Sequence, residues 1–411
     1  MVTRAAVMAA MKQHFGHETF KPLQEDIIRA TLNGQDVLAV MPTGGGKSLC
    51  YQLPAVVCPG LTVVVSPLVS LMKDQVDALS RAGVPAAMLE KDLEFEVWRA
   101  RMDAARSGQL KLLYVSPERL QADSLLSMLS TSNVRAVVVD EAHCISQWGH
   151  DFRPEYRLIK NLKAVCPRAS FAAFTASATA AVRDDIAASL ALRDPGLFIG
   201  SFDRPNLFYA ATPKASREYT AFRMVEVVHS MKGASGIVYA LSRRGADEAA
   251  ASLRDAGVKA RAYHAGMHST ARAEVQEEWL SGHVHVVTAT IAFGMGIDKP
   301  DVRFVLHLDL PKDLESYYQE TGRAGRDGAP SSCLLFYSSR DIAFHAKWLK
   351  EKPAEEAARA EERLARMIAF AEGGGCRRAA LLAYFGEEYR GSNGDGKCGY
   401  CDTCVRKEMG R

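Results

Sequence analysis

Residues 41–48, Met-Pro-Thr-Gly-Gly-Gly-Lys-Ser, place three glycines between a mostly apolar run at 36–40 and the start of a helical pattern. Glycines let successive backbone N–H groups converge on one anion, and a helix start adds partial positive charge there. In such a loop the lysine reaches the β- and γ-phosphates of a nucleotide, and the serine hydroxyl binds Mg²⁺. The usual pattern has glycine where this chain has Met41, so the match is incomplete. We still expect a nucleoside triphosphate site built from Thr43, Gly44, Gly45, Gly46, Lys47 and Ser48.

Two acids, Asp140 and Glu141, follow the apolar run at 136–139. In a phosphate-loop enzyme an acid at the end of such a strand holds Mg²⁺. The neighbouring carboxylate is placed to orient or deprotonate the attacking water. We therefore expect Ser48 and Asp140 as Mg²⁺ ligands and Lys47, Asp140 and Glu141 as catalytic residues.

Apolar runs alternate with helical patterns in two successive series, which is typical of parallel sheets with helices on both faces. We expect strands at 36–40, 61–66, 110–116, 136–140 and 170–175, and then at 236–240, 260–263, 285–288, 303–308 and 332–337. The alternation pauses near 205–212. This predicts an α/β fold with two such domains at 1–208 and 209–345 and a small helical domain at 346–411. Because ligands bind at the carboxyl ends of parallel strands, residues 66–67, 116–118, 140–143 and 175–179 are expected to line one crevice.

Composition limits the remaining possibilities. A chain of 411 residues with 48% hydrophobic and 24% charged residues is globular and too long for one core. The net charge of +3 neither demands nor excludes nucleic acid as a partner. No apolar run approaches the 18 or so residues of a membrane span, and the first residues lack the features of a signal peptide. We expect a cytoplasmic protein.

Four of the nine cysteines crowd the C-terminal end: Cys376, then Cys398-x-x-Cys401-x-x-Cys404. A C-x-x-C turn directs two sulfurs at one centre, and Cys376 completes a tetrahedron, so structural Zn²⁺ is favoured. An iron–sulfur cluster is the alternative, but its pattern requires a fourth cysteine at position 408, which is Glu408. Unmetallated thiols are the remaining alternative. Such a site suits a reducing cytosol better than a disulfide framework does.

The segment 144–154 carries Trp148, Phe152 and Arg153 directly after the two acids. Aromatic rings and a guanidinium on a loop suit base stacking and phosphate contact with single-stranded nucleic acid. The alternative is that Trp148 and Phe152 belong to a small core.

Two further sets of residues suggest contacts with a nucleotide. Gln24, upstream of the glycine loop, offers a donor and an acceptor that suit the edge of adenine, although it can also be an ordinary polar helix residue. Gln319, Arg323 and Arg326 lie close together in the second half, and arginines from a second domain can stabilise a transferring phosphoryl group. The alternative for these arginines is a solvated surface.

Taken together, several stretches resemble the RecQ family of DNA helicases within helicase superfamily 2. They are 20–24, 41–48, 66–75, 140–154, 289–301, 319–328 and the four-cysteine tail. The resemblance covers essentially the whole chain. It implies two RecA-like domains with ATP at their interface, 3′-to-5′ translocation on single-stranded DNA, and a zinc domain on the second lobe.

The resemblance also implies roles for single residues. Gln24 reads adenine, His17 stacks where the family often has a larger ring, and Lys21 stands where arginine is usual. Arg323 and Arg326 reach ATP, and Asp298 lies near the ribose. The distinctive stretches 263–267 and 290–303 supply His264 and Thr290 as further candidate DNA contacts beside Trp148, Phe152 and Arg153. Ser177 replaces the usual threonine of the Thr-Ala-Thr pattern.

The resulting hypothesis is an ATP-dependent 3′-to-5′ DNA helicase of recombination and repair, with ATP, Mg²⁺ and Zn²⁺ as cofactors. We expect single-stranded and forked DNA as partners, no membrane, and a monomer in the bacterial cytosol. Family members commonly carry a winged-helix domain after the zinc cysteines, whereas this sequence ends at Arg411, so a shortened form or a short member is expected. The alternatives are a DNA-stimulated ATPase that remodels or anneals DNA with little unwinding, and a zinc-anchored DNA-binding module with ATP as a switch.

Overall fold

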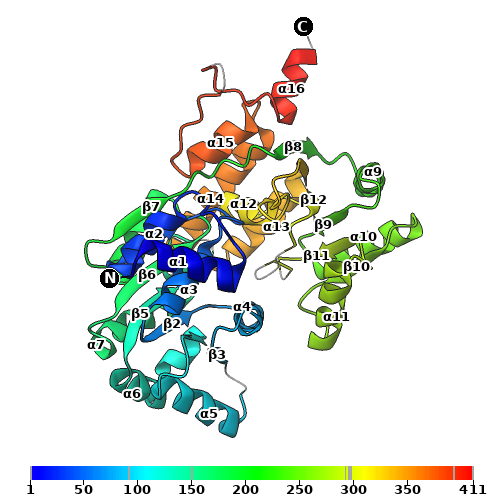
Figure 1. The fold of residues 1–411 in the computed structure, drawn as a ribbon. Helices are drawn as coiled ribbons and strands as arrows, with labels where there is room; N and C mark the ends of the chain where they lie inside the picture. Colours follow the sequence, from blue (N-terminus) through cyan, green and yellow to red (C-terminus); the bar gives the residue numbers. More distant parts are fainter. Residues whose placement is uncertain are drawn as a thin grey trace. The chain divides into compact units, whose positions relative to one another are not determined.

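The computed structural model of the chain describes residues 2–90, 93–149, 151–291, 293–294, 299–391 and 394–409. They form two compact units, Met1–Ser201 and Phe202–Arg411, whose elements are labelled in Figure 1. None of the described helices is both long enough and apolar enough to span a bilayer.

The first unit is built on a seven-stranded sheet in the order β3-β4-β2-β5-β6-β1-β7, in which every pairing is parallel. Its strands are β1 (Val37–Val40), β2 (Leu61–Val65), β3 (Ala86–Leu89), β4 (Leu112–Val115), β5 (Val134–Val139), β6 (Ser170–Thr175) and β7 (Gly196–Ile199). Its α-helices are α1 (Arg4–Ala10), α2 (Gln24–Leu32), α3 (Lys47–Val57), α4 (Val69–Arg81), α5 (Phe95–Arg106), α6 (Asp123–Thr131), α7 (Leu162–Val165) and α8 (Ala180–Ser189). Shorter helical turns are η1 (Met11–Phe15), η2 (Pro117–Gln121), η3 (Ala142–Ile145) and η4 (Pro154–Asn161).

The inner strands explain why a parallel sheet forms. Every residue of β1, β2, β4 and β6 is buried. Strands that are covered on both faces read as continuous apolar runs rather than as alternating ones. Tyr51 of α3 packs against Phe174 of β6 in the main core, with ring centroids 5.4 Å apart. These contacts fix the carboxyl ends of the strands, where the polar residues follow.

The second unit has a six-stranded parallel sheet in the order β10-β11-β9-β12-β13-β8. Its strands are β8 (Leu207–Pro213), β9 (Ser235–Tyr239), β10 (Ala260–Tyr263), β11 (Val286–Ala289), β12 (Val302–His307) and β13 (Ser331–Tyr337). Its helices are α9 (Arg217–Ser230), α10 (Arg243–Asp255), α11 (Ser269–Leu280), α12 (Leu314–Thr321), α13 (Ser339–Leu349), α14 (Ala354–Glu372), α15 (Arg377–Tyr384) and α16 (Asp402–Met409). Helices α14, α15 and α16 all contact the edge strand β8.

The α/β fold with two parallel sheets and a helical four-cysteine region is confirmed. Three strands were not predicted: β3, β7 and β8. Strand β8 occupies the segment where the sequence pattern suggested a pause, and it pairs with β13 over its whole length. In the helical region, α14 begins directly after Pro353. The boundaries of the three predicted domains remain a prediction.

Candidate functional site

The glycine loop connects the end of β1 to the start of α3, as the sequence predicts. Gly44 and Gly46 adopt φ angles of 83° and 76°, which side chains other than glycine rarely adopt. A Cβ at Gly45 would lie 2.9 Å from the carbonyl oxygen of Pro42, so the turn is also too tight for a larger residue there. The loop thus ends on the free N–H groups at the N-terminus of α3, with Lys47 and Ser48 in its first turn. The Nζ of Lys47 donates to the carbonyl oxygen of Met41 at 3.3 Å.

Gln24 contacts the glycine loop directly. Its Nε2 donates to the carbonyl oxygens of Gly45 and Gly46 at 3.3 and 3.1 Å, and its Oε1 accepts from the N–H of Lys21 at 2.8 Å. The Nζ of Lys21 donates to the carbonyl oxygen of Gly44 at 2.8 Å. Gln24 is 2% exposed, whereas His17 is exposed. Gln24 and Lys21 therefore hold the glycine loop, and the contact of Gln24 and His17 with adenine remains a prediction.

Asp140 and Glu141 lie at the carboxyl end of β5, and Glu141 has a left-handed backbone with φ of 46°. The N–H of Glu141 donates to Oδ1 of Asp140 at 3.0 Å, and the hydroxyl of buried Tyr156 donates to the carbonyl oxygen of Asp140 at 3.0 Å. Burial, and then the charge of Glu141, raise the pKa of Asp140 to about 7, while the charge of Lys47 opposes that shift. A divalent cation beside the Asp140 carboxylate would favour its charged form. The carboxylate of Asp140 and the hydroxyl of Ser48 are oxygen ligands, which Mg²⁺ prefers.

His143 joins the ends of β5 and β6. Its Nδ1 lies 2.9 Å from Oγ1 of Thr175 and 3.3 Å from Oε2 of Glu141. Burial lowers the pKa of His143, but Cys144 and Glu141 raise it by more, so the net shift is upward. The segments 140–143 and 175–179 therefore do meet at one edge of the sheet, as the strand order predicts.

The loop after these acids, 144–154, presents its aromatic residues unequally. Trp148 is 51% exposed, so the alternative that it is a core residue is wrong. Phe152 is half-buried, with the guanidinium of Arg157 5.3 Å from its ring centroid. Arg153 lies 3.3 Å from Oδ2 of Asp151 and donates Nη1 to the carbonyl oxygen of Pro67 at 3.2 Å. The loop is thus tied to the segment that follows β2.

In the second unit, α12 carries Gln319, which is half-buried, and the turn after it carries the two arginines. Arg323 is 7% exposed and donates Nη1 to the carbonyl oxygen of Gly294, whereas Arg326 is half-buried. Burial raises the pKa of nearby Tyr239 to about 12, although the charges of both arginines act against that rise. The alternative of a wholly solvated arginine surface is wrong for Arg323.

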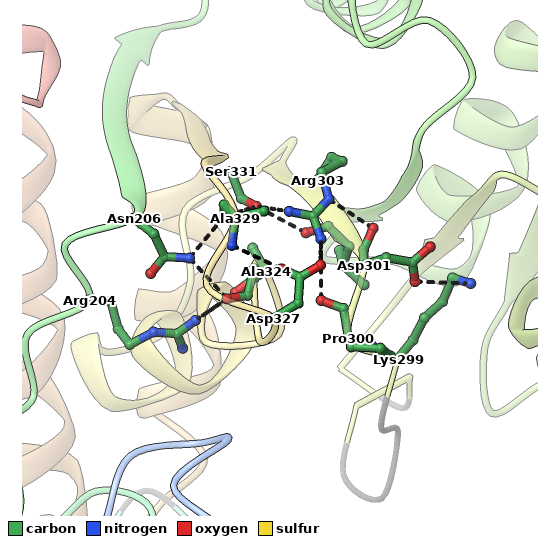
Figure 2. Close-up of polar contacts among 12 residues, drawn as sticks. Arg204, Asn206, Lys299, Pro300, Asp301, Arg303, Ala324, Asp327, Ala329 and Ser331 are labelled. Atoms are coloured by element: carbon green, nitrogen blue, oxygen red, sulfur yellow. Dashed lines mark hydrogen bonds and ion pairs between the residues drawn. The ribbon is translucent and has the colours of Figure 1, made fainter. Parts of the chain in front are cut away.

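A network that the sequence did not predict fixes this turn, and Figure 2 shows it. Arg204 donates to the carbonyl oxygens of Gly322, Ala324 and Gly325 at 3.2, 2.8 and 3.0 Å. Asn206 donates to that of Gly325 at 2.9 Å, and a Cβ at Gly325 would lie only 2.4 Å from its Nδ2. The only sequence signal was the Arg204-Pro205-Asn206 run just before β8.

On the other side of the turn, Arg303 of β12 pairs with Asp327 and donates to the carbonyl oxygens of Pro300 and Asp301 at 3.3 and 3.1 Å (Figure 2). Lys299 pairs with Asp301 at 3.2 Å. The arginine turn is therefore held at both ends by side chains from neighbouring strands and loops.

The remaining candidates of this unit lie at the carboxyl ends of β10 and β11. His264 is 8% exposed and its Nε2 lies 3.1 Å from Oδ1 of Asp247, while Thr290 is half-buried. The N–H of Thr290 donates to the carbonyl oxygen of Tyr263 at 3.4 Å, which brings the two candidates to one sheet edge. Asp298 lies outside the described residues.

The four C-terminal cysteines come together as predicted, and their Sγ atoms all lie within 4.8 Å of one another. The Sγ atoms of Cys398 and Cys404 are 4.0 Å apart, close to the roughly 3.8 Å edge of a tetrahedral zinc–thiolate site. Hydrogen bonds from Cys376 and Cys398 lower the pKa of Cys401. Cys376 caps α15, and Cys401 forms an isolated bridge with Tyr209 of β8. The set fits Zn²⁺ and anchors this region to the second sheet.

Comparison with known proteins agrees with this geometry. Residues 21–186 match the family model of DEAD/DEAH box helicases, 220–328 the helicase conserved C-terminal domain, and 339–405 the RecQ zinc-binding domain. The chain is 47% identical over 406 residues to the ATP-dependent DNA helicase RecQ of Haemophilus influenzae, covering 98% of this chain and 64% of that protein. It is 40% identical to the protein of the same name from Bacillus subtilis, covering 98% of this chain and 67% of that one.

Among solved structures, the Mycobacterium smegmatis helicase Lhr bound to single-stranded DNA and AMP-PNP has a similar fold, with a TM-score of 0.64 at 23% identity. That alignment covers 83% of this chain and 49% of Lhr. The chain thus spans about two thirds of the length of the bacterial relatives that it matches.

Proposed function

Because this chain belongs to the RecQ family of DNA helicases, we propose that it is an ATP-driven helicase core that moves 3′ to 5′ along single-stranded DNA and separates duplex strands. One observation in particular supports this. The glycine loop and the Asp140–Glu141–His143 cluster lie at the carboxyl ends of strands in one sheet, and the chain continues from the cluster into the loop of exposed Trp148. The proposed nucleotide site and the proposed DNA surface are thereby neighbours along the chain.

We propose that Lys47 and the N–H groups of the glycine loop bind the β- and γ-phosphates, with Gln24, Lys21 and His17 at the base. Mg²⁺, held by Ser48 and Asp140, would neutralise charge on the phosphate oxygens. Glu141 orients the attacking water and accepts its proton, since it lies next to the Mg²⁺ carboxylate. Arg323 and Arg326, with Gln319, stabilise the charge of the transferring phosphoryl group, and Asp298 contacts the ribose.

For DNA, we propose that bases stack on Trp148 and Phe152 and that Arg153, His264 and Thr290 contact the backbone. Movement of the 144–154 loop then reaches Glu141 through His143, which couples DNA binding to hydrolysis. The Zn²⁺ of the cysteine cluster has a structural role. A monomer that acts on single-stranded and forked DNA in the bacterial cytosol is part of the same proposal.

The experiment is ATP hydrolysis with Mg²⁺, measured with and without single-stranded DNA. We expect DNA to stimulate the wild-type rate and Lys47→Ala to lower it by at least about a hundredfold, the cost of losing a strong charge-stabilising donor. Lys160→Ala, an exposed lysine of the same unit, is the matched control and should keep the wild-type rate. Normal hydrolysis by Lys47→Ala would remove the proposed phosphate site.

A further inference from the structure

Three side chains of different chemistry meet in the loop after β5, in the first unit, whereas the cysteine cluster belongs to the second. The Sγ of Cys144 lies 3.7 Å from Nε2 of His143 and 3.7 Å from Oδ2 of Asp151. One ligand atom from each residue lies within 4.8 Å of the other two. The set offers one nitrogen, one sulfur and one oxygen to a common point.

We propose that His143, Cys144 and Asp151 form a second metal site, which binds Zn²⁺ or a chemically similar ion with water as the fourth ligand. Ligand atoms at about 2.0–2.3 Å from a tetrahedral zinc ion lie roughly 3.3–3.8 Å from one another, which matches both 3.7 Å separations. A thiolate and an imidazole favour zinc over Mg²⁺, which prefers oxygen ligands in an octahedron. The site is therefore distinct from the proposed Mg²⁺ site at Ser48 and Asp140.

The surrounding structure already orients the ligands. The Nδ1 of His143 lies 2.9 Å from Oγ1 of Thr175 and 3.3 Å from Oε2 of Glu141, which turns Nε2 toward Cys144. A carboxylate behind a metal-binding histidine is the usual second-sphere arrangement, and it raises the basicity of the ligand. The carboxylate here is the proposed catalytic one.

A tight turn brings Asp151 back to Cys144. The N–H of Gly149 donates to the carbonyl oxygen of Ser146 at 3.1 Å. A Cβ on Gly149 would lie 2.6 Å from the carbonyl oxygen of His143, so the turn is too tight for a larger residue. The N–H of Arg153 then donates to the carbonyl oxygen of Cys144 at 2.8 Å. These backbone bonds bring Asp151 back toward Cys144.

Binding has two costs that define its properties. The buried Cys144 must lose its proton to bind an ion as a thiolate, so binding releases a proton. The Oδ2 of Asp151 already pairs with Arg153 at 3.3 Å, so the ion competes with that guanidinium. His143 and Cys144 are buried, whereas the Asp151 side chain is 34% exposed and gives the route of entry. A bound ion would fix His143, which contacts Glu141, and the loop that carries Trp148. We therefore expect the ion to inhibit DNA-stimulated ATP hydrolysis.

The test is metal stoichiometry, which needs no activity. The full chain, with its cysteine cluster loaded, is dialysed against buffered micromolar Zn²⁺ in the presence of Mg²⁺ and then analysed for zinc. We expect two equivalents in the wild type and one in both Cys144→Ala and Asp151→Asn. Cys166→Ala removes a buried thiol outside any ligand group and should keep two. Co²⁺ should likewise add a thiolate charge-transfer band in the wild type that Cys144→Ala lacks.

A single equivalent in the wild type, or two in the Cys144→Ala chain, would overturn the proposal. If Cys144→Ala does not fold, as judged by its melting curve, Asp151→Asn decides: retention of two equivalents overturns the second site. Because zinc content is measured without ATP or DNA, failure here leaves the proposed helicase function standing.

Discussion

Arg377 and Asp402 form a buried, two-pronged ion pair: Nε to Oδ1 is 3.0 Å and Nη2 to Oδ2 is 3.3 Å. Each residue is 5% exposed. Asp402 also accepts the N–H of Ala211 in β8 at 3.1 Å, and Arg377 donates to the carbonyl oxygen of Phe370. This pair therefore joins the cysteine region, the end of α14 and the edge of the second sheet.

Removing one partner should be costly because the other charge stays buried. We expect Arg377→Ala to lower the free energy of unfolding by about 3–5 kcal/mol and to make zinc easier to extract with a chelator. The control is Arg390→Ala, because Arg390 pairs with Glu388 in a largely exposed position and should cost under about 1 kcal/mol. Denaturant unfolding and zinc release measure both effects. Equal stabilities of the two variants would show that the buried pair does not anchor this region.

Arg326→Ala should reduce kcat for ATP hydrolysis by roughly 10³–10⁵-fold with little change in nucleotide affinity, as for other arginines that stabilise a transferring phosphoryl group. Arg323→Ala should lose activity and also stability, because Arg323 is 7% exposed and holds the Gly294 carbonyl. Arg340→Ala, an exposed arginine of the same unit, serves as the control. Wild-type kcat in both Arg326→Ala and Arg323→Ala would exclude a role for the pair in hydrolysis.

Trp148→Ala should abolish DNA stimulation of ATP hydrolysis while leaving most single-strand binding and the melting temperature unchanged. The reason is that Trp148 is 51% exposed, so its loss removes a surface contact rather than core packing. Trp348→Ala removes a tryptophan of α13 that is 58% exposed and should leave stimulation intact. A Trp148→Ala protein that melts lower yet keeps its stimulation ratio would contradict a coupling role.

Glu315 predicts a pH dependence of stability. Burial, and then the charge of Asp313, raise its pKa from a usual value of 4.5 to about 7. The folded state therefore binds the proton of Glu315 more tightly than the unfolded state does. Its contribution to stability is greatest below pH 4.5 and is lost as pH rises from 4.5 to about 7. The loss should be about 1–3 kcal/mol.

Glu315→Gln should remove this loss, so the variant should gain stability over the wild type as pH rises from 4.5 to 7. Glu361→Gln changes an exposed glutamate and should follow the wild-type curve. Chemical unfolding at several pH values measures the difference. Curves for Glu315→Gln and wild type that stay parallel across the window would contradict the assignment.

The sequence predicted those parts of the fold that local patterns specify. Buried strands such as β1 read as unbroken apolar runs, and the glycine loop and the cysteine spacing specify their geometry in a few residues. The missed strands β7 and β8 are not buried throughout: β7 alternates between half-buried and exposed residues, and β8 mainly between buried and half-buried ones. The pairing of β8 with β13 joins residues more than a hundred positions apart, which no local pattern shows.

The contacts around the site were missed for the same physical reason. Arg204 donates hydrogen bonds to residues of the arginine turn that are 118–121 positions away in the sequence. Gln24 donates to residues of the glycine loop that are 21–22 positions away. The sequence shows that Gln24 and Arg204 have polar side chains. Which carbonyl oxygens they bind depends on the folded structure.

Strand separation tests the central claim most directly. A forked duplex with a 3′ single-stranded tail is incubated with the wild-type chain, ATP and Mg²⁺, beside a duplex with only a 5′ tail and beside Lys47→Ala. The account predicts ATP-dependent separation of the 3′-tailed substrate by the wild type alone. DNA-stimulated ATP hydrolysis without strand separation would show an ATPase that remodels or anneals DNA, and separation by Lys47→Ala would contradict the ATP-driven mechanism.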